Sequence, residues 1–338
     1  MMMKETIRVI QVGLGPIGRE VARHVLARPG LELVGAVDVS ADLAGRPLAE
    51  VLECGAPDGI VVTADPGELI AVARPDIAIL CTASKLAQAA SHMRPYLSQG
   101  VSIVTSCEEA TAPDLENDPL ARTVDDWARA GNAAVLGTGV NPGFLMDLWP
   151  VAMSLPCLRV RSVEVERVQD AAPRRKPFRD KIGAGLTLED FEEKVAVGDF
   201  GHVGLETCLH MIVRAFGWTL REFEEGLEPV LANSTTTCPG GAEIPEGGVR
   251  GIHQWIHGYV GDDETPRIRL RFLAAVGEKE SWDRVVLEGE PDIRCIIEGG
   301  TPGEQATAGA LINGVFVLHG AAPGFHAAID LPWAHYRE

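Results

Sequence analysis

The chain has 338 residues, about twice the usual size of a single domain, so two domains are expected. Its hydrophobic fraction of 46% and charged fraction of 23% are ordinary for a globular protein with a substantial core. The net charge of -18 repels phosphate backbones and anionic lipids, which argues against nucleic-acid and membrane-surface partners.

The start of the chain and its cysteines predict a cytoplasmic protein. The first residues run directly into an apolar strand at residues 7–12, which leaves no room for a signal peptide. No apolar run approaches the roughly 18 residues that span a bilayer. The seven cysteines are odd in number and never form a CxxC pair, which favours reduced thiols over a disulfide or zinc framework.

From residue 7 to about residue 140, short apolar runs alternate with segments of helical spacing. The apolar runs are residues 7–12, 33–37, 77–80, 101–104 and 133–136. Runs without polar alternation are typical of strands that are covered on both faces of a sheet. Strands and helices in alternation predict an α/β fold with a doubly wound parallel sheet, the Rossmann architecture.

After about residue 145 the strands become longer and more alternating, at residues 159–169, 248–260, 267–276 and 282–287. Such alternation predicts an α+β domain with a largely antiparallel sheet. Residues 187–216 have helical spacing, and a long helix is expected over residues 301–318. We therefore predict a dinucleotide-binding domain at residues 1–146, completed by residues 302–338, and a substrate and dimerisation domain at residues 147–301.

The stretch VIQVGLGPIGREVARHV places Gly13, Gly15 and Gly18 in GxGxxG spacing between a strand and a helix. In this motif the glycines permit a tight turn, close approach to a pyrophosphate, and helix-to-strand packing. Pro16 and Ile17 begin the helix, whose N-terminal amides favour phosphate. The pattern predicts a site for NAD or NADP.

The second strand ends in Asp38, 20 residues after Gly18, where an acid commonly binds the adenosine ribose. That position favours NAD. Ser40 and Arg46 follow closely and would suit the 2′-phosphate of NADP, so use of both coenzymes stays open.

Polar residues follow the next strands of the predicted sheet. Thr82, Ala83 and Ser84 come after the strand at residues 77–80, and Glu108 and Glu109 come after the strand at residues 101–104. Because ligands lie at the carboxyl ends of such strands, these residues are expected beside the nicotinamide ribose and ring. Successive side chains point in opposite directions, so at most one of the two glutamates faces the ring.

Cys107, beside the glutamates, has two interpretations. A thiolate nucleophile would need an activating partner, and no cysteine-histidine signature surrounds this residue. A free cysteine is more often a small, buried apolar residue, which is the interpretation we favour.

Three further features have less specific interpretations. His253 and His257 lie in a predicted strand with Trp255 and Tyr259 on the same face, which suits pocket lining, a subunit contact or ordinary sheet pairing, and no metal site is expected. The basic run RRKPF at residues 174–178 is most typical of a solvated loop. The junction at residues 137–144 suits a linker, a hinge or a support for Asn141.

Several motifs in order resemble one known family: TSCEE (105–109), GTGVNPGFLMD (137–147), RVQDAAPRR (167–175), GHVGLET (201–207) and the late ATAGALINGVF. Together they are similar to the dihydrodipicolinate reductase-like 2,4-diaminopentanoate dehydrogenases and native amine dehydrogenases, over nearly the whole chain. The HHxxKxDAPSGT-like stretch of true dihydrodipicolinate reductases is absent, so their cyclic substrate is not expected.

The resemblance implies NAD(P)H-dependent, reversible reductive amination of a small aldehyde or ketone with ammonia. It assigns the catalytic role to Glu108 and places Asn141, Arg167, Gln169 and His202 around the substrate. The one-sided sheet of the second domain further suggests a homodimer. Two alternatives stay open: a diamine or amino-acid dehydrogenase, which would need a cation such as Arg167, and a non-catalytic NAD(P)-sensing protein.

Overall fold

The computed structural model describes residues 6–57, 59–198, 200–238 and 243–336. By its contacts the chain divides into two compact units. The first consists of Met1–Phe144 and Pro302–Glu338, and the second of Leu145–Thr301.

The first unit is built on a parallel sheet of seven strands in the order β15-β6-β5-β4-β1-β2-β3. The strands are β1 (Ile7–Val12), β2 (Leu31–Val37), β3 (Val62–Thr63), β4 (Ile77–Leu80), β5 (Ser102–Thr105), β6 (Ala134–Gly137) and β15 (Gly324–His326). The strands β1, β4, β5 and β6 are buried almost throughout, which explains their continuous apolar sequences. The predicted doubly wound parallel sheet is confirmed, with its switch point between β1 and β4.

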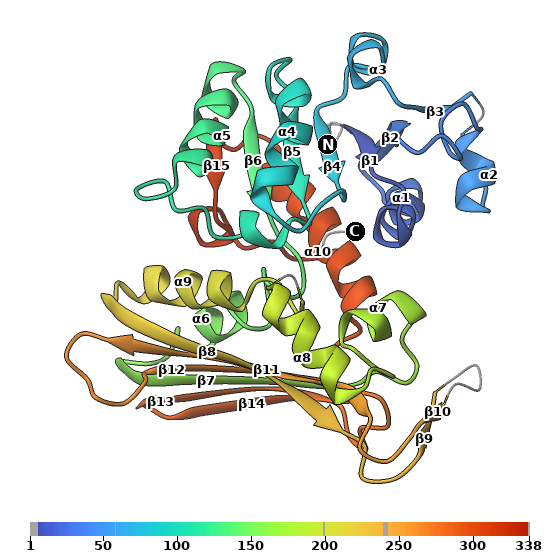
Figure 1. Cartoon of the computed structure of the whole chain (residues 1–338). Coiled ribbons are helices and arrows are strands. Elements are labelled where there is room, and N and C mark those ends of the chain that lie inside the picture. The colour runs from blue at the N-terminus through green and yellow to red at the C-terminus, as the bar shows by residue number, and fades with distance from the viewer. Residues whose placement is uncertain (1–5, 58, 199, 239–242, 337–338) are drawn as a thin grey trace. The chain divides into compact units, whose positions relative to one another are not determined.

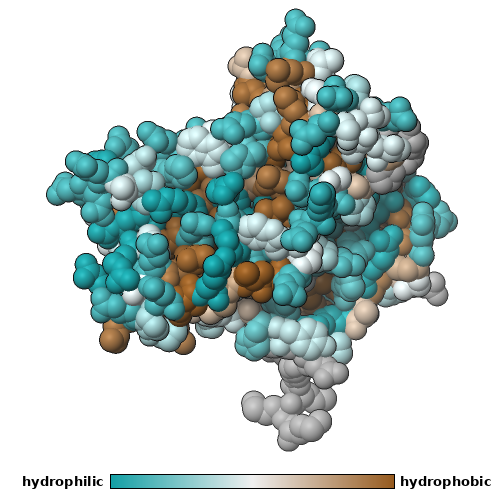
Figure 2. Space-filling model, turned by 90° about the horizontal axis from the view of Figure 1, so that it is seen from below, coloured by the Kyte–Doolittle hydropathy of each residue, from teal (hydrophilic) through white to brown (hydrophobic). Residues whose placement is uncertain are grey.

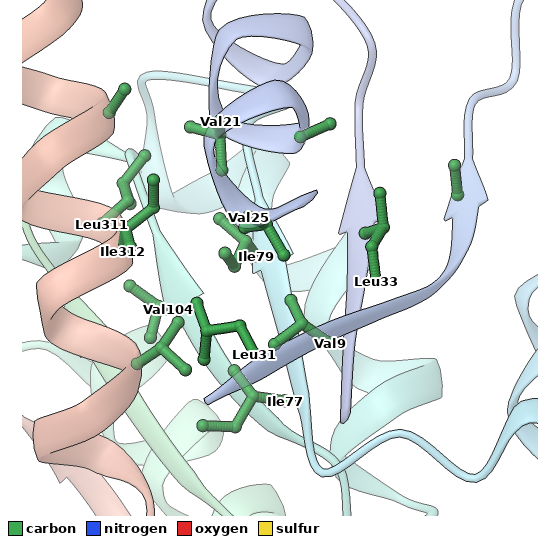
Figure 3. Packing of buried hydrophobic residues seen from close by; sticks show 14 of the residues in the cluster. Val9, Val21, Val25, Leu31, Leu33, Ile77, Ile79, Val104, Leu311 and Ile312 are labelled. Atoms are coloured by element: carbon green, nitrogen blue, oxygen red, sulfur yellow. The ribbon is translucent and has the colours of Figure 1, made fainter. Parts of the chain in front are cut away.

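Helices cover this sheet (Figure 1). They are α1 (Pro16–Ala27), α2 (Leu48–Leu52), α3 (Pro66–Ala73), α4 (Leu86–Leu97), α5 (Pro119–Ala130) and α10 (Gly303–Leu318), with short 3-10 helices η1 (Glu108–Ala110) and η2 (Ala328–Asp330). The late helix α10 packs against α1 and the sheet, where Leu311 and Ile312 join the cluster of Val21, Val25 and Val104 (Figure 3). Within the described ranges, no helix is long and apolar enough to cross a membrane.

The second unit contains a six-stranded sheet in the order β14-β13-β7-β12-β11-β8. The strands are β7 (Arg159–Asp170), β8 (Leu220–Leu231), β11 (Val249–Val260), β12 (Ile268–Ala275), β13 (Trp282–Glu290) and β14 (Ile293–Glu298), beside a separate pair, β9 (Thr236–Thr237) and β10 (Glu243–Ile244). Among the six strands only β7 and β12 pair in parallel. The prediction of a largely antiparallel sheet is confirmed.

Two details of this unit differ from the sequence-based expectation. The segment expected to be helical over residues 187–216 forms two helices, α8 (Leu188–Val197) and α9 (Leu205–Phe216), because glycines with positive φ at 198, 201 and 204 interrupt it. Strand β8 is absent from the predicted elements, and its glutamates and Pro229 are uncommon in strands. It lies at the edge of the sheet, where a proline is tolerated.

The two faces of this sheet carry different residues. The helices α6 (Leu148–Met153), α8 and α9 lie on one face, and α7 (Lys176–Lys181) follows β7 (Figure 1). Ile252 and Ile256 of β11 are buried beneath this helical layer, whereas the alternate side chains from His253 to Tyr259 are half-buried. On the face opposite the helices, hydrophobic side chains lie between hydrophilic ones (Figure 2).

Candidate active site

The predicted glycine motif forms the turn from β1 into α1. Gly13 has a φ of +82°, and a Cβ added there would lie 2.5 Å from the carbonyl oxygen of Cys81. A Cβ added to Gly18 would lie 1.9 Å from the carbonyl oxygen of Gly13. Packing within the protein therefore explains the first and third glycines.

Gly15 is different, because packing against the protein does not require a glycine there. A Cβ on Gly15 would meet no atom of the described residues within 4 Å, and its φ of -63° suits any residue. Open space beside the N-terminus of α1 fits close approach of a pyrophosphate to the backbone. The residues present therefore fit a dinucleotide.

Gly15→Ala is expected to fold normally and to bind NADH about 10- to 100-fold more weakly, because hydrogen bonds to a charged phosphate contribute about 1.5–3 kcal/mol. Titration of NADH fluorescence measures this. Gly309→Ala is the matched control, since a Cβ at Gly309 in α10 also meets no described atom within 4 Å. Equal NADH affinity in the two variants would contradict the assignment.

Asp38 lies just beyond the end of β2 and is held by two backbone amides. Its Oδ2 accepts a hydrogen bond from Leu14 N at 2.7 Å, and its Oδ1 accepts one from Ser40 N at 2.9 Å. Arg46, the residue suited to a 2′-phosphate, forms an exposed ion pair with Glu50 at 3.6 Å. The carboxylate is thus fixed beside the glycine turn, as an acid that binds ribose hydroxyls would be.

A cavity of about 280 Å³ lies at the switch point of the sheet, within the first unit. Its lining residues are Gly15, Pro16, Ile17, Gly18, Cys81, Thr82, Ala83, Ser84, Ser106, Glu108, Gly139, Val140, Asn141, Pro142 and Thr307. The structure thus brings together most of the residues predicted for the cofactor, the predicted catalytic glutamate and Asn141. The sequence reasoning missed Thr307, because it lies far along the chain in α10 and no local motif marks it.

Glu108 is placed in this cavity by the 3-10 turn η1, which follows β5. The turn packs on bare backbone: a Cβ added to Gly137 of β6 would lie 2.2 Å from the carbonyl oxygen of Ala110. Thr111, 1% exposed, closes the turn by donating from its hydroxyl to the carbonyl oxygen of Glu108 at 2.8 Å. Close packing therefore fixes the backbone that carries Glu108.

Glu109 has a different environment. Its Oε2 accepts a hydrogen bond of 2.7 Å from Leu86 N, the first residue of α4. A carboxylate at this position satisfies a free helix amide and interacts favourably with the helix dipole. Glu108 lines the cavity and Glu109 binds α4, as expected if only one of the pair faces the ligand.

Cys107 is fully buried, and its thiol donates to the carbonyl oxygen of Ser84 at 3.2 Å. Burial is the main cause that raises the pKa of this thiol to about 12; the charges of Glu108 and Glu109 also raise it, and a hydrogen bond with the backbone of Ala110 opposes the rise. A thiol with this pKa is protonated near neutral pH and is a poor nucleophile. The structure supports the interpretation of Cys107 as a buried apolar residue.

Asn141 lies in the segment that follows β6 and is 9% exposed. The preceding amide, Val140 N, donates to the hydroxyl of Thr307 at 3.4 Å, which links this segment to α10. The junction predicted as a linker or support is therefore held within the first unit on the cavity side.

Arg167 and Gln169 belong to β7 in the second unit and meet at one backbone carbonyl. Arg167 Nη2 donates to Thr301 O at 2.9 Å, and Gln169 Nε2 donates to the same oxygen at 3.2 Å. Asp283, 1% exposed, pairs with Arg167 Nη1 at 3.2 Å and accepts from Thr301 N at 2.7 Å. Desolvation lowers the pKa of Arg167 to about 10, against the opposing effect of Asp283. Arg167 is thus a buried cation with a paired charge.

His202 also belongs to the second unit. Its backbone N–H donates to Gln254 Oε1 at 2.9 Å, and Gln254 Nε2 donates back to His202 O at 3.0 Å. The imidazole lies against Phe272, with ring centroids 4.8 Å apart. Since Phe272 is the neighbour of Arg167 in the pairing of β12 with β7, the structure brings these predicted residues to one region of the sheet.

The remaining sequence features lie elsewhere in the second unit. His253 and His257 lie in β11, as predicted, where His253 contacts Glu228 at 3.3 Å and His257 stacks near Trp255. In the basic run, Arg174 lies over the ring of Phe178. Across the ranges that the structure describes, no three His, Cys, Asp or Glu side chains gather as metal ligands would.

Comparison with known proteins adds to this geometry. The chain is 29% identical over 336 residues to the 2,4-diaminopentanoate dehydrogenase of Acetoanaerobium sticklandii, covering 97% of this chain and 94% of that protein. It is 24% identical over 354 residues to an amine dehydrogenase of Streptomyces virginiae, covering 96% of each. The solved structure of an amine dehydrogenase from Mycobacterium smegmatis superposes with a TM-score of 0.85 at 24% identity, covering 98% of this chain and 97% of that one.

The fold, with a parallel sheet and a glycine turn in one unit and a mixed sheet in the other, thus agrees with that of the solved dehydrogenase. The sequence also matches the profile of the 2,4-diaminopentanoate dehydrogenase C-terminal domain over residues 144–336. Because this match extends over more than half of the chain, the protein belongs to the 2,4-diaminopentanoate dehydrogenase family, as its motifs predicted.

Proposed function

We propose that this protein is an NAD(P)-dependent amine dehydrogenase that catalyses reversible reductive amination of a small aldehyde or ketone with ammonia. The observation that carries the proposal is that Glu108 shares one cavity with the glycine turn and with Asn141. The names of the two relatives, a 2,4-diaminopentanoate dehydrogenase and an amine dehydrogenase, support an oxidoreductase that acts on CH–NH2 groups.

The cofactor in this proposal is a nicotinamide dinucleotide, whose reduced ring supplies the hydride. Gly13, Gly15 and Gly18 would hold it at the glycine turn, together with Pro16 and Ile17, and Thr82, Ala83 and Ser84 would lie along the nicotinamide ribose. Asp38 would accept hydrogen bonds from the hydroxyls of the adenosine ribose. We infer a preference for NAD, because the fixed carboxylate of Asp38 repels the 2′-phosphate of NADP. NADP would serve as a second coenzyme.

Glu108 would act on the substrate through its carboxylate. It can take a proton from ammonium to free ammonia as the nucleophile, and then give that proton to the hydroxyl of the hemiaminal, which leaves as water. The carbon that accepts the hydride becomes a cationic iminium, which a fixed negative charge stabilises more strongly in a water-poor cavity than in solvent. One side chain thus supplies both the base and the electrostatic stabilisation.

In this proposal residues 1–146 with 302–338 bind the dinucleotide, and residues 147–301 bind the substrate through Arg167, Gln169 and His202. Asn141 is proposed to contact the substrate from the cavity that it shares with Glu108. The pairing of Arg167 with Asp283 bears on the substrate class. A cation neutralised by a buried carboxylate is a weak anchor for a substrate carboxylate, which supports an uncharged carbonyl compound over an amino acid.

We also infer a cytoplasmic homodimer. All seven cysteines are free thiols, as in a reducing compartment. The half-buried face of the second sheet, which carries Trp255 and Tyr259, suits contact with a second copy. Light scattering of the purified protein tests this: twice the mass of the 36.1 kDa chain supports the inference, and the single mass contradicts it.

The proposed activity is tested by following NADH and NADPH absorbance with a panel of aldehydes and ketones, each with and without ammonium. Oxidation of the coenzyme is expected only when carbonyl compound and ammonium are both present. The panel includes keto acids of matched size, which are expected to react more slowly than the uncharged compounds. Coenzyme oxidation at the same rate with and without ammonium would contradict the proposal, as would tight NADH binding without any turnover.

A further inference from the structure

We propose that Glu109 is a positioning residue for the reaction, which ties the turn that carries Glu108 to the loop between β4 and α4. The inference rests on the proposed function, because it takes Glu108 as the catalytic residue. Both segments line the same cavity: the turn through Glu108, and the loop through Thr82, Ala83 and Ser84. A tie between them sets the distance from the acid to the cofactor loop.

The two segments are joined by a series of hydrogen bonds. Ser106 N donates to Leu80 O at 3.0 Å, and Glu109 N donates to Ser84 O at 3.3 Å. The thiol of Cys107 donates to the same carbonyl oxygen of Ser84 at 3.2 Å. Residues on both sides of Glu108 therefore bind the loop, while Glu108 itself lines the cavity.

The shortest contact in this series is the one made by the side chain of Glu109. Leu86 N donates to its Oε2 at 2.7 Å, and the acceptor carries a negative charge, which makes such a bond about twice as strong as a neutral one. The N-cap residue of α4, Lys85, makes no side-chain capping bond, so Glu109 takes the role of the cap from another segment. The start of α4 and the end of the loop thus depend on Glu109.

A change at Glu109 is consequently expected to act on catalysis and not on stability alone. Without the carboxylate, the loop and the turn lose the side-chain bond that holds them in register. A displacement of about 1 Å at reacting groups can lower a rate by roughly 100-fold. The same displacement would loosen the contacts that the loop makes with the cofactor.

Three variants separate positioning from simple helix capping. Glu109→Ala removes the acceptor, and Glu109→Gln keeps an amide oxygen that can accept from Leu86 N without the charge. Asp118→Ala is the matched control, because Asp118 caps α5 by accepting from Leu120 N at 2.8 Å and lines no part of the cavity. For each variant we would measure the melting temperature, the Kd for NADH, and kcat and KM of the ammonia-dependent reaction.

Glu109→Ala and Asp118→Ala are expected to lower the melting temperature by similar amounts, since the loss of a cap lowers the free energy of unfolding by about 1 kcal/mol in either helix. Only Glu109→Ala is expected to lower kcat, by about 10- to 100-fold, and to weaken NADH binding several-fold. Glu109→Gln is expected to keep most of the wild-type kcat and most of the affinity for NADH. Kinetics of Glu109→Ala that match those of Asp118→Ala would overturn the proposal, as would a Glu109→Gln variant as impaired as Glu109→Ala.

The NADH titration also keeps this proposal separate from the proposed function. If the wild-type protein showed no ammonia-dependent turnover, the function would be wrong, and the effect of Glu109 on the cofactor loop would still be read from the Kd values. If turnover is present and the Kd and kcat of Glu109→Ala equal those of the wild type, only the positioning role fails.

Discussion

Glu108→Gln is expected to lower the ammonia-dependent rate by about 100- to 10,000-fold, the range of a lost general base. The amide has nearly the same shape as the carboxylate but can neither take the proton from ammonium nor stabilise the iminium by its charge. Because the pyrophosphate is proposed to bind at the glycine turn and not at Glu108, the Kd for NADH is expected to stay within a few-fold of the wild-type value. Steady-state absorbance assays and NADH titration measure the two quantities.

Glu109→Gln is the natural control for this variant, since it makes the same chemical change one residue further along the chain. In the wild-type protein the carboxylate of Glu109 binds α4, and Glu109 is not among the residues that line the cavity. A large loss of rate in Glu108→Gln and a small one in Glu109→Gln would assign the chemistry to one residue of the pair. A Glu108→Gln variant with an unchanged rate would remove the catalytic assignment.

Asp283→Ala is expected to lower the free energy of unfolding by about 3–5 kcal/mol, the usual cost of removing one member of a buried ion pair. The variant leaves the guanidinium of Arg167, 2% exposed, without its counter-charge and takes the acceptor from Thr301 N. Urea denaturation at constant pH measures the loss.

The exposed pair of Lys176 and Asp180 provides the comparison for this variant. Its atoms approach to 2.7 Å, closer than those of the buried pair, but both side chains are more than half exposed. Asp180→Ala is expected to cost less than about 1 kcal/mol because solvent screens the charges. An Asp283→Ala variant as stable as Asp180→Ala would show that the buried pair contributes little to folding.

The first unit was the easier part to predict from the sequence. Each of its central strands is a continuous apolar run, and the order of the strands follows from the rule for doubly wound sheets. The rule also predicted that the residues after β4 and β5 lie at the carboxyl ends of the strands, where the ligand binds, and one cavity at this edge is lined by Thr82, Ser84 and Glu108. Local sequence was sufficient to predict these elements because the apolar residues of each one follow a single pattern, either a continuous run or helical spacing.

Contacts between distant residues could not be predicted in the same way. The bond between Glu109 and Leu86 N, and the pairing of Arg167 with Asp283, join segments that no local pattern connects. Strand β8 was missed for a related reason: its glutamates are tolerated because the strand lies at the sheet edge, where Glu224 and Glu228 bond to Tyr259 and Trp255 of β11. The polarity of a strand thus depends on its place in the sheet.

In the proposed reaction, hydride from the dinucleotide and nitrogen from ammonia reach the same carbon of the substrate. The most direct test is to incubate the protein with NADH deuterated at the transferred position of nicotinamide C4, nitrogen-15 ammonium and a ketone, and to analyse the product by mass spectrometry. We expect the product to be an amine that carries both deuterium and nitrogen-15. An alcohol that carries deuterium and no nitrogen would contradict this expectation.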